Sequence, residues 1–148
     1  MINKEMILNT LKKKDIEDMK NNSQNFLRLD NRIFLLICQL GISVAVVYIG
    51  IRRHLNDNTG KCYPSNRLLQ KELNVSDKTI TKAVKILKEN GFIKVKVGRG
   101  GCYYYEFPDV PNPKNFVAGI SDEELIALTE EEDGDCYEEE EEYYEEIN

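Results

Sequence analysis

Two short helices separated by only two residues restrict the possible folds of this sequence more than any other feature. One helix is predicted over residues 65–73 and the next over residues 76–90, and each begins at a serine, a preferred helix N-cap. Gly91 ends the second helix. The link, Asn74-Val75, is short and supplies one apolar side chain. Helices joined in this way cross and share a core, which is the geometry of a helix-turn-helix.

A glycine-centred hairpin is predicted to follow these helices. Residues 92–97 and 102–107 are apolar, β-branched and aromatic runs around a Gly-Arg-Gly-Gly turn at residues 98–101. Upstream, two helices are predicted over residues 32–40 and 43–56, and Cys62-Tyr63 is predicted to be extended because Pro64 follows it. The order helix, short strand, helix, turn, helix, hairpin predicts an α+β fold of the winged-helix type.

The N-terminal part contains the longest uncharged run of the chain. Residues 33–51 carry no charge, but Gly41 is predicted to end one helix and Ser43 to cap the next. Each half is too short to cross a bilayer, so we expect buried core helices and no membrane partner. Residues 1–22 are predicted to form one amphipathic helix and residues 26–30 a short strand. The absence of a signal-peptide pattern favours a cytoplasmic location.

Charge is distributed unevenly along the chain. The formal net charge is -6, yet fifteen of the 26 acidic residues lie in residues 121–148, which contain no Lys or Arg. The other 120 residues hold all 20 basic residues and have a net charge of +9. The predicted organisation is an amphipathic helix at residues 1–24, a DNA-binding domain at residues 25–108, a linker at residues 109–120 and a mostly disordered acidic tail at residues 121–148.

The second helix of the pair is predicted to have one apolar and one basic face. Ile80, Ala83, Val84 and Leu87 fall on a single stripe that is expected to enter the core. In a helix-turn-helix this second helix enters the major groove of DNA, and the hairpin can add phosphate or minor-groove contacts. Residues 50–107 have a local charge of +7, which suits phosphate neutralisation. The candidate residues for binding double-stranded DNA are Ser65, Arg67, Ser76, Lys78, Thr79, Thr81, Lys82, Lys85, Lys94, Lys96 and Arg99.

Catalytic and metal sites are not expected. The four cysteines, at positions 38, 62, 102 and 136, form no close pair, and His54 is the single histidine. Zinc sites usually take ligands as close pairs, and a Cys or Ser nucleophile would need a histidine partner, so we expect no cofactor, no disulfide framework and no enzymatic activity.

The stretch from Val47 to Val95 resembles a known family. It contains Tyr63-Pro64-Ser65, a Val-Ser-x-x-Thr-Ile run at residues 75–80 and a Glu-x-Gly-Phe-Ile run at residues 89–93. These features resemble the winged helix-turn-helix domain of replication initiators, replisome organisers and regulators of Gram-positive plasmids and phages. The resemblance implies that Ser65 holds a phosphate and that Ser76, Lys78, Thr79 and Lys82 meet the groove. It also implies a homodimer, through the N-terminal helices or residues 33–40.

The sequence does not distinguish between several cellular processes in which such a domain could act. Replication initiators of this kind usually have a large second domain, whereas this chain has an acidic tail, so we expect a transcriptional regulator or an accessory factor in plasmid or phage replication, transfer or partition. The alternative is a protein-interaction module whose acidic tail recruits a partner. Within the tail, residues 121–128 are expected to form a short helix with a Ser121–Glu124 capping box. The rest could solubilise the chain, compete with DNA for the basic face or bind a basic partner.

Overall fold

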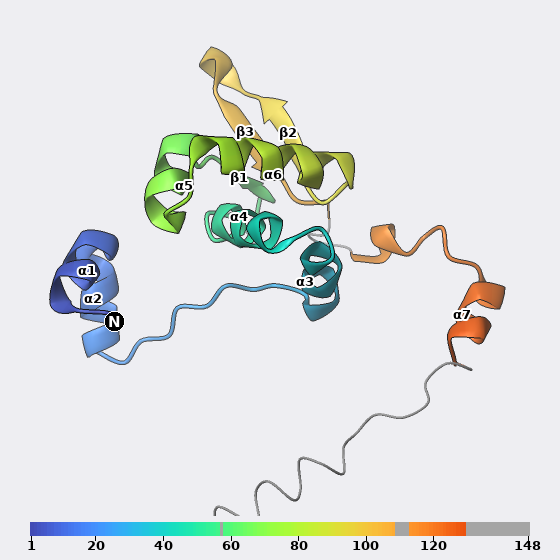
Figure 1. Ribbon diagram of the computed structural model, residues 1–148, viewed down its shortest axis with the longest axis horizontal. Coiled ribbons are helices and arrows are strands. Elements are labelled where there is room, and N and C mark those ends of the chain that lie inside the picture. Colours follow the sequence, from blue (N-terminus) through green and yellow to red (C-terminus); the bar gives the residue numbers. More distant parts are fainter. Residues whose placement is uncertain (57, 109–112, 130–148) are drawn as a thin grey trace, which may run out of the picture. The chain divides into compact units, whose positions relative to one another are not determined.

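The computed structural model describes residues 1–56, 58–108 and 113–129 and divides the chain into two compact units, residues 1–113 and 114–148 (Figure 1). Each unit is described separately. The predicted disorder of the acidic tail beyond residue 129 lies outside the described residues. The elements of the first unit are α1 (Lys4–Thr10), α2 (Lys13–Lys20), α3 (Asn31–Cys38), α4 (Ile42–Arg52), β1 (Lys61–Cys62), α5 (Asn66–Leu73), α6 (Asp77–Glu89), β2 (Lys94–Val97), the 3₁₀ turn η1 (Arg99–Gly101) and β3 (Tyr103–Glu106).

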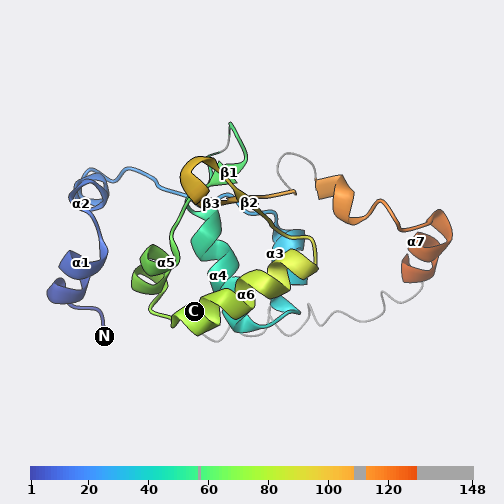
Figure 2. The same ribbon diagram turned by 90° about the horizontal axis from the view of Figure 1, so that it is seen from above.

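Helix α4 forms the centre of the domain and packs against α3, α5 and α6 (Figure 2). Its Val47, Tyr48 and Ile51 are fully buried in this packing. Gly50 allows α5 to approach closely, since a Cβ atom there would lie 2.5 Å from Leu73 Cδ1. The core is therefore built around the apolar run that the sequence divides at Gly41.

A three-stranded antiparallel sheet completes the domain, with the strand order β1-β3-β2. Cys62 pairs with Tyr105 of β3, and Tyr105 pairs in turn with Val95 of β2. Cys62 and Tyr105 are buried, and desolvation raises the pKa of the Cys62 thiol to about 12. The hairpin from Lys94 to Glu106, named the wing below, projects beyond the helices. The fold is α+β and consistent with the predicted winged helix.

The prediction of one helix over residues 1–22 is wrong. The chain is extended at Leu11 and Lys12, which separates α1 from α2. The Asp15 carboxylate accepts a hydrogen bond from the Lys12 backbone N–H at 3.1 Å and begins α2 anew. None of the residues of α1 or α2 is buried, so no packing against a core requires a continuous helix.

The prediction of a strand over residues 26–30 is also wrong, because no neighbouring strand pairs with this segment in the described chain. Asp30 instead caps α3, and its Oδ1 accepts hydrogen bonds from the backbone N–H groups of Arg32 and Ile33 at 2.8 and 3.4 Å. The ion pair with Arg32 and these hydrogen bonds hold the pKa of the Asp30 carboxyl far below its usual range.

The division of the uncharged run is confirmed, although its details differ from expectation. Gly41 has a φ of +124°, which favours glycine, and it serves as the N-cap of α4 in place of Ser43. Helix α4 ends at Arg52, four residues before the predicted end. Within the described ranges, no helix is both long and apolar enough to cross a membrane.

The second unit contains α7 (Asp122–Thr129), preceded by the 3₁₀ turn η2 (Pro113–Phe116) at the boundary between the units. The predicted capping box is confirmed. Glu124 Oε2 accepts from the Ser121 backbone N–H at 2.8 Å, and Ser121 Oγ accepts from the Glu124 backbone N–H at 3.3 Å.

Candidate nucleic-acid interface

The turn between α5 and α6 is formed by residues that tolerate its backbone geometry. Asn74 adopts the left-handed conformation, with φ 54° and ψ 46°, and ends α5. Ser76 Oγ accepts a hydrogen bond from the Thr79 backbone N–H at 3.2 Å and begins α6. Asn66 Nδ2 donates to Asp77 Oδ1 at 3.1 Å, which links the first turns of the two helices. The predicted helix-turn-helix is present, and its two caps are confirmed.

Helix α6 separates its apolar and basic side chains as predicted. Ile80, Ala83 and Leu87 are buried against the domain, whereas Lys78, Thr81, Lys82 and Lys85 are exposed on the other side. These four residues with Glu89 form what is named the α6 face below. The prediction that Val84 belongs to the core is wrong, because this residue is half-buried beside the wing. Three exposed lysines on successive turns give the α6 face the charge that phosphate binding needs.

The predicted serine and threonine contacts are partly used within the protein. Ser65 Oγ accepts from the Leu68 backbone N–H at 3.1 Å, and Ser76 Oγ lies 2.9 Å from Thr79 Oγ1. Ser65 and Ser76 remain exposed, as does Arg67, whereas Thr79 is half-buried. Thr79 is therefore the candidate least able to reach a ligand.

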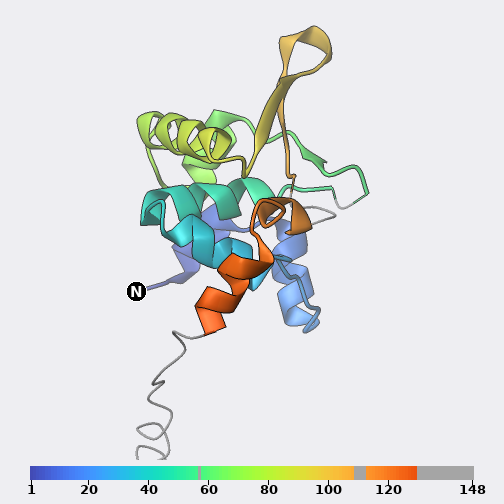
Figure 3. The same cartoon turned by 90° about the vertical axis from the view of Figure 1, so that its right-hand side faces the viewer.

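The wing projects beyond α6 (Figure 3) and carries further exposed cations. Arg99 is exposed in the turn, where Gly100 and Gly101 have positive φ values of 73° and 77°. Lys94 and Lys96 are exposed on one face of β2, as their spacing predicts. However, Lys96 Nζ lies 3.1 Å from Glu106 Oε2 on β3, so part of its charge is neutralised. The sequence did not reveal this pair, because it depends on the register of the hairpin.

A groove of about 510 Å³ separates α6 from the wing, and sequence reasoning did not anticipate it. Its lining carries no charged side chain. The groove is lined by Tyr63, Pro64, Ser65, Asn66, Thr81, Val84, Val95, Cys102, Tyr103 and Tyr105. The two basic elements therefore flank an uncharged depression.

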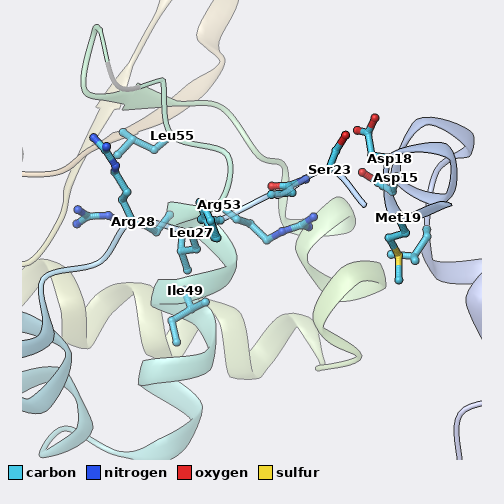
Figure 4. A pocket seen from close by; sticks show the side chains of 13 residues that line it. Asp15, Asp18, Met19, Ser23, Leu27, Arg28, Ile49, Arg53 and Leu55 are labelled. Carbon is cyan, nitrogen blue, oxygen red and sulfur yellow. The ribbon is translucent and has the colours of Figure 1, made fainter. Parts of the chain in front are cut away.

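A second cavity, of about 780 Å³, lies between the N-terminal segment and α4 (Figure 4). It mixes the carboxylates of Asp15 and Asp18 with the guanidinium groups of Arg28, Arg52 and Arg53. Because charges of both signs line it, this cavity does not extend the basic surface.

One carboxylate of α5 contacts the residues that follow α4. Glu72 forms an ion pair with Arg53, and its Oε1 lies 2.6 Å from His54 Nε2. Burial alone would raise the pKa of Glu72, but the hydrogen bond with His54 and the charge and hydrogen bond of Arg53 hold it below its usual value. His54 thus helps to hold the first helix of the pair in place.

We expect Glu72→Gln to destabilise the domain by about 1 kcal/mol at neutral pH, because it removes a partly buried, charge-assisted contact. Since the folded-state pKa of Glu72 is lowered, its stabilisation is present above the unfolded-state pKa and is lost as the pH falls through the folded value. Thermal melting as a function of pH should show the wild type and the variant converging in acid. A difference that stays constant down to the lowest pH would contradict this assignment.

Comparison with known proteins identifies the same segment. Residues 39–93 match the family model described as a helix-turn-helix domain. No curated protein and no solved structure matches the chain. The matched range runs from the end of α3 through α4, α5 and α6 to Ile93 and stops before the wing. Residues 39–93 of this chain therefore form a helix-turn-helix domain.

Proposed function

We propose that the protein binds double-stranded DNA, with the α6 face in the major groove and the wing beside it. The observation that carries this proposal is the set of exposed lysines at positions 78, 82 and 85, opposite the side of α6 that packs on the domain. The first turns of such a helix reach base edges and phosphates. Arg99, in the exposed turn of the wing, would add a contact at a neighbouring phosphate.

The role that fits this binding is regulation of transcription, or an accessory role in plasmid or phage replication, transfer or partition. The sequence resemblance at residues 47–95 supports this range of roles. A homodimer would place two α6 faces on half-sites one helical turn apart. The proposed activity is binding without catalysis.

A titration of duplex DNA at several salt concentrations tests the proposal. Each phosphate that a lysine or arginine neutralises contributes a slope of about -0.9 to the plot of log affinity against log salt. Contacts from three or four of these cations predict a slope of about -3 to -4. Fluorescence anisotropy with a labelled duplex measures it. Absence of binding at low salt, to random DNA and to the DNA upstream of its own gene, would refute the proposal.

The acidic segment allows a second prediction, because fifteen carboxylates share one chain with the basic surface. A tethered competitor acts at an effective concentration on the order of millimolar. Deleting residues 129–148 should therefore tighten binding to duplex DNA. The gain should be largest at low salt, where screening of charges is weakest, and for random DNA sequences. The measurement is the same anisotropy titration on the truncated chain. Unchanged affinity would contradict this competition and leave two alternatives, in which the segment recruits a basic protein partner or solubilises the chain.

A further inference from the structure

The outer face of the wing sheet differs from the α6 face in carrying aromatic rings as well as cations. Lys61, Glu106 and Lys94 are direct neighbours across the three strands, and Tyr104 pairs with Lys96. Because side chains alternate along a strand, these five side chains share one face, and the buried Cys62 and Tyr105 occupy the other. The register of β3 therefore assembles three lysines around a tyrosine and a glutamate.

Two tyrosine rings contact each other at the surface of this face. The rings of Tyr63 and Tyr104 have centroids 5.3 Å apart with an angle of 36° between their planes. Tyr63 is 64% exposed, and Tyr104 is half-buried. Lys61 Nζ lies 5.2 Å from the centre of the Tyr104 ring, a distance typical of a cation–π contact. These contacts favour one arrangement of the two rings, which lowers the entropy cost of stacking on them.

This combination fits an unpaired DNA strand better than a duplex. In a duplex the faces of the bases are stacked on one another, so exposed tyrosines cannot stack on them, whereas a single strand offers both free bases and phosphates. Three lysines against one glutamate leave this face with net positive charge, which is complementary to phosphate. An acidic peptide would match the charge but would leave the rings unused.

We propose that the outer face of the wing sheet binds single-stranded DNA, with bases stacked on Tyr63 and Tyr104 and phosphates beside Lys61, Lys94 and Lys96. This inference rests on the proposed function, because it takes DNA as the partner of the protein. It adds a second surface that binds single-stranded DNA. The α6 face would hold duplex while the wing sheet holds an adjacent unpaired strand.

The test compares three labelled probes on the full chain by fluorescence anisotropy. They are an oligothymidylate of about 12 nucleotides, within the range of known single-strand site sizes, an abasic strand of the same length, and a duplex of about 20 base pairs. Oligothymidylate should bind more tightly than the abasic strand, because only the first can stack. Equal affinity for the two strands would overturn the proposal by showing that charge alone holds them.

Matched variants then locate the site. Tyr63→Leu and Tyr104→Leu should each weaken oligothymidylate binding at least about five-fold, the equivalent of about 1 kcal/mol for one stacked base. Tyr63→Phe and Tyr104→Phe keep the ring and should bind as the wild type does. None of the four should change duplex affinity, whereas Lys82→Ala should weaken duplex binding and leave oligothymidylate binding unchanged.

The outcomes separate this inference from the proposed function. Duplex binding without single-strand binding overturns only the inference, whereas failure to bind either probe overturns both. Loss of duplex and single-strand affinity to the same degree in the leucine variants would also overturn it, because the rings would then serve the duplex site. Thermal melting identifies a leucine variant that is misfolded. If Tyr104→Leu is unstable, Tyr63→Leu still tests the proposal, because Tyr63 is exposed and its replacement should leave the domain folded.

Discussion

Replacing Lys78, Lys82 and Lys85 together by alanine should lower the affinity for duplex DNA by roughly five-hundred-fold to a thousand-fold at moderate salt. Each lysine that neutralises a phosphate releases a condensed counterion, which is worth roughly ten-fold at about 0.1 M salt. The slope of log affinity against log salt should become shallower by about 3. The free energy of unfolding should hardly change, because all three side chains are exposed.

The matched control also removes three positive charges, but from the N-terminal segment. Lys12, Lys13 and Lys14 are exposed in the N-terminal segment, away from α6 in the sequence. Their replacement by alanine should leave both the affinity and the salt slope much closer to the wild-type values. If the two triple variants lose affinity equally, the attraction is a property of the net charge of the protein and the α6 face is not a specific site.

Leu87→Ala should destabilise the domain by about 2–5 kcal/mol, the range found for deleting most of a fully buried leucine side chain. Leu87 has no exposed surface and lies on the side of α6 that packs on the domain, so its loss leaves a cavity. Urea denaturation measures the change. DNA affinity should be retained by the fraction that stays folded, because Leu87 does not reach the α6 face.

The loss of stability in Leu87→Ala should be compared with that in Val84→Ala. Val84 is half-buried and lines the groove beside the wing, so we expect a smaller loss of stability than at Leu87. A loss below about 1 kcal/mol for Leu87→Ala would contradict the placement of α6 on the domain.

Local sequence signals predicted the central helices and the wing well. Ser65, Ser76 and Gly91 act within one turn of chain, and the spacing of Ile80, Ala83 and Leu87 directly reports the face that α6 buries. The same logic predicted the exposed lysines of the α6 face. These features depend on neighbours three or four residues apart, which a sequence displays.

Contacts between distant segments could not be predicted in the same way. The Lys96–Glu106 ion pair and the Tyr63–Tyr104 ring pair require the register of β3 against its neighbours, and Glu72 meets His54 only when α5 packs on α4. The break at Leu11 was missed because both flanking segments are helical and neither Pro nor Gly marks the boundary. The failed strand at residues 26–30 shows that alternation alone does not supply a pairing partner.

Mapping backbone amide resonances while duplex DNA is added tests the central claim most directly. The account predicts that the largest shifts occur in the first turns of α6, near Lys78 and Lys82, and in the wing turn around Arg99. Amides of Val47 and Ile51, in the buried centre of α4, should shift little. Large shifts confined to α1, α2 or α7, with those of α6 unchanged, would show that the helix-turn-helix domain of this protein does not bind DNA through the α6 face.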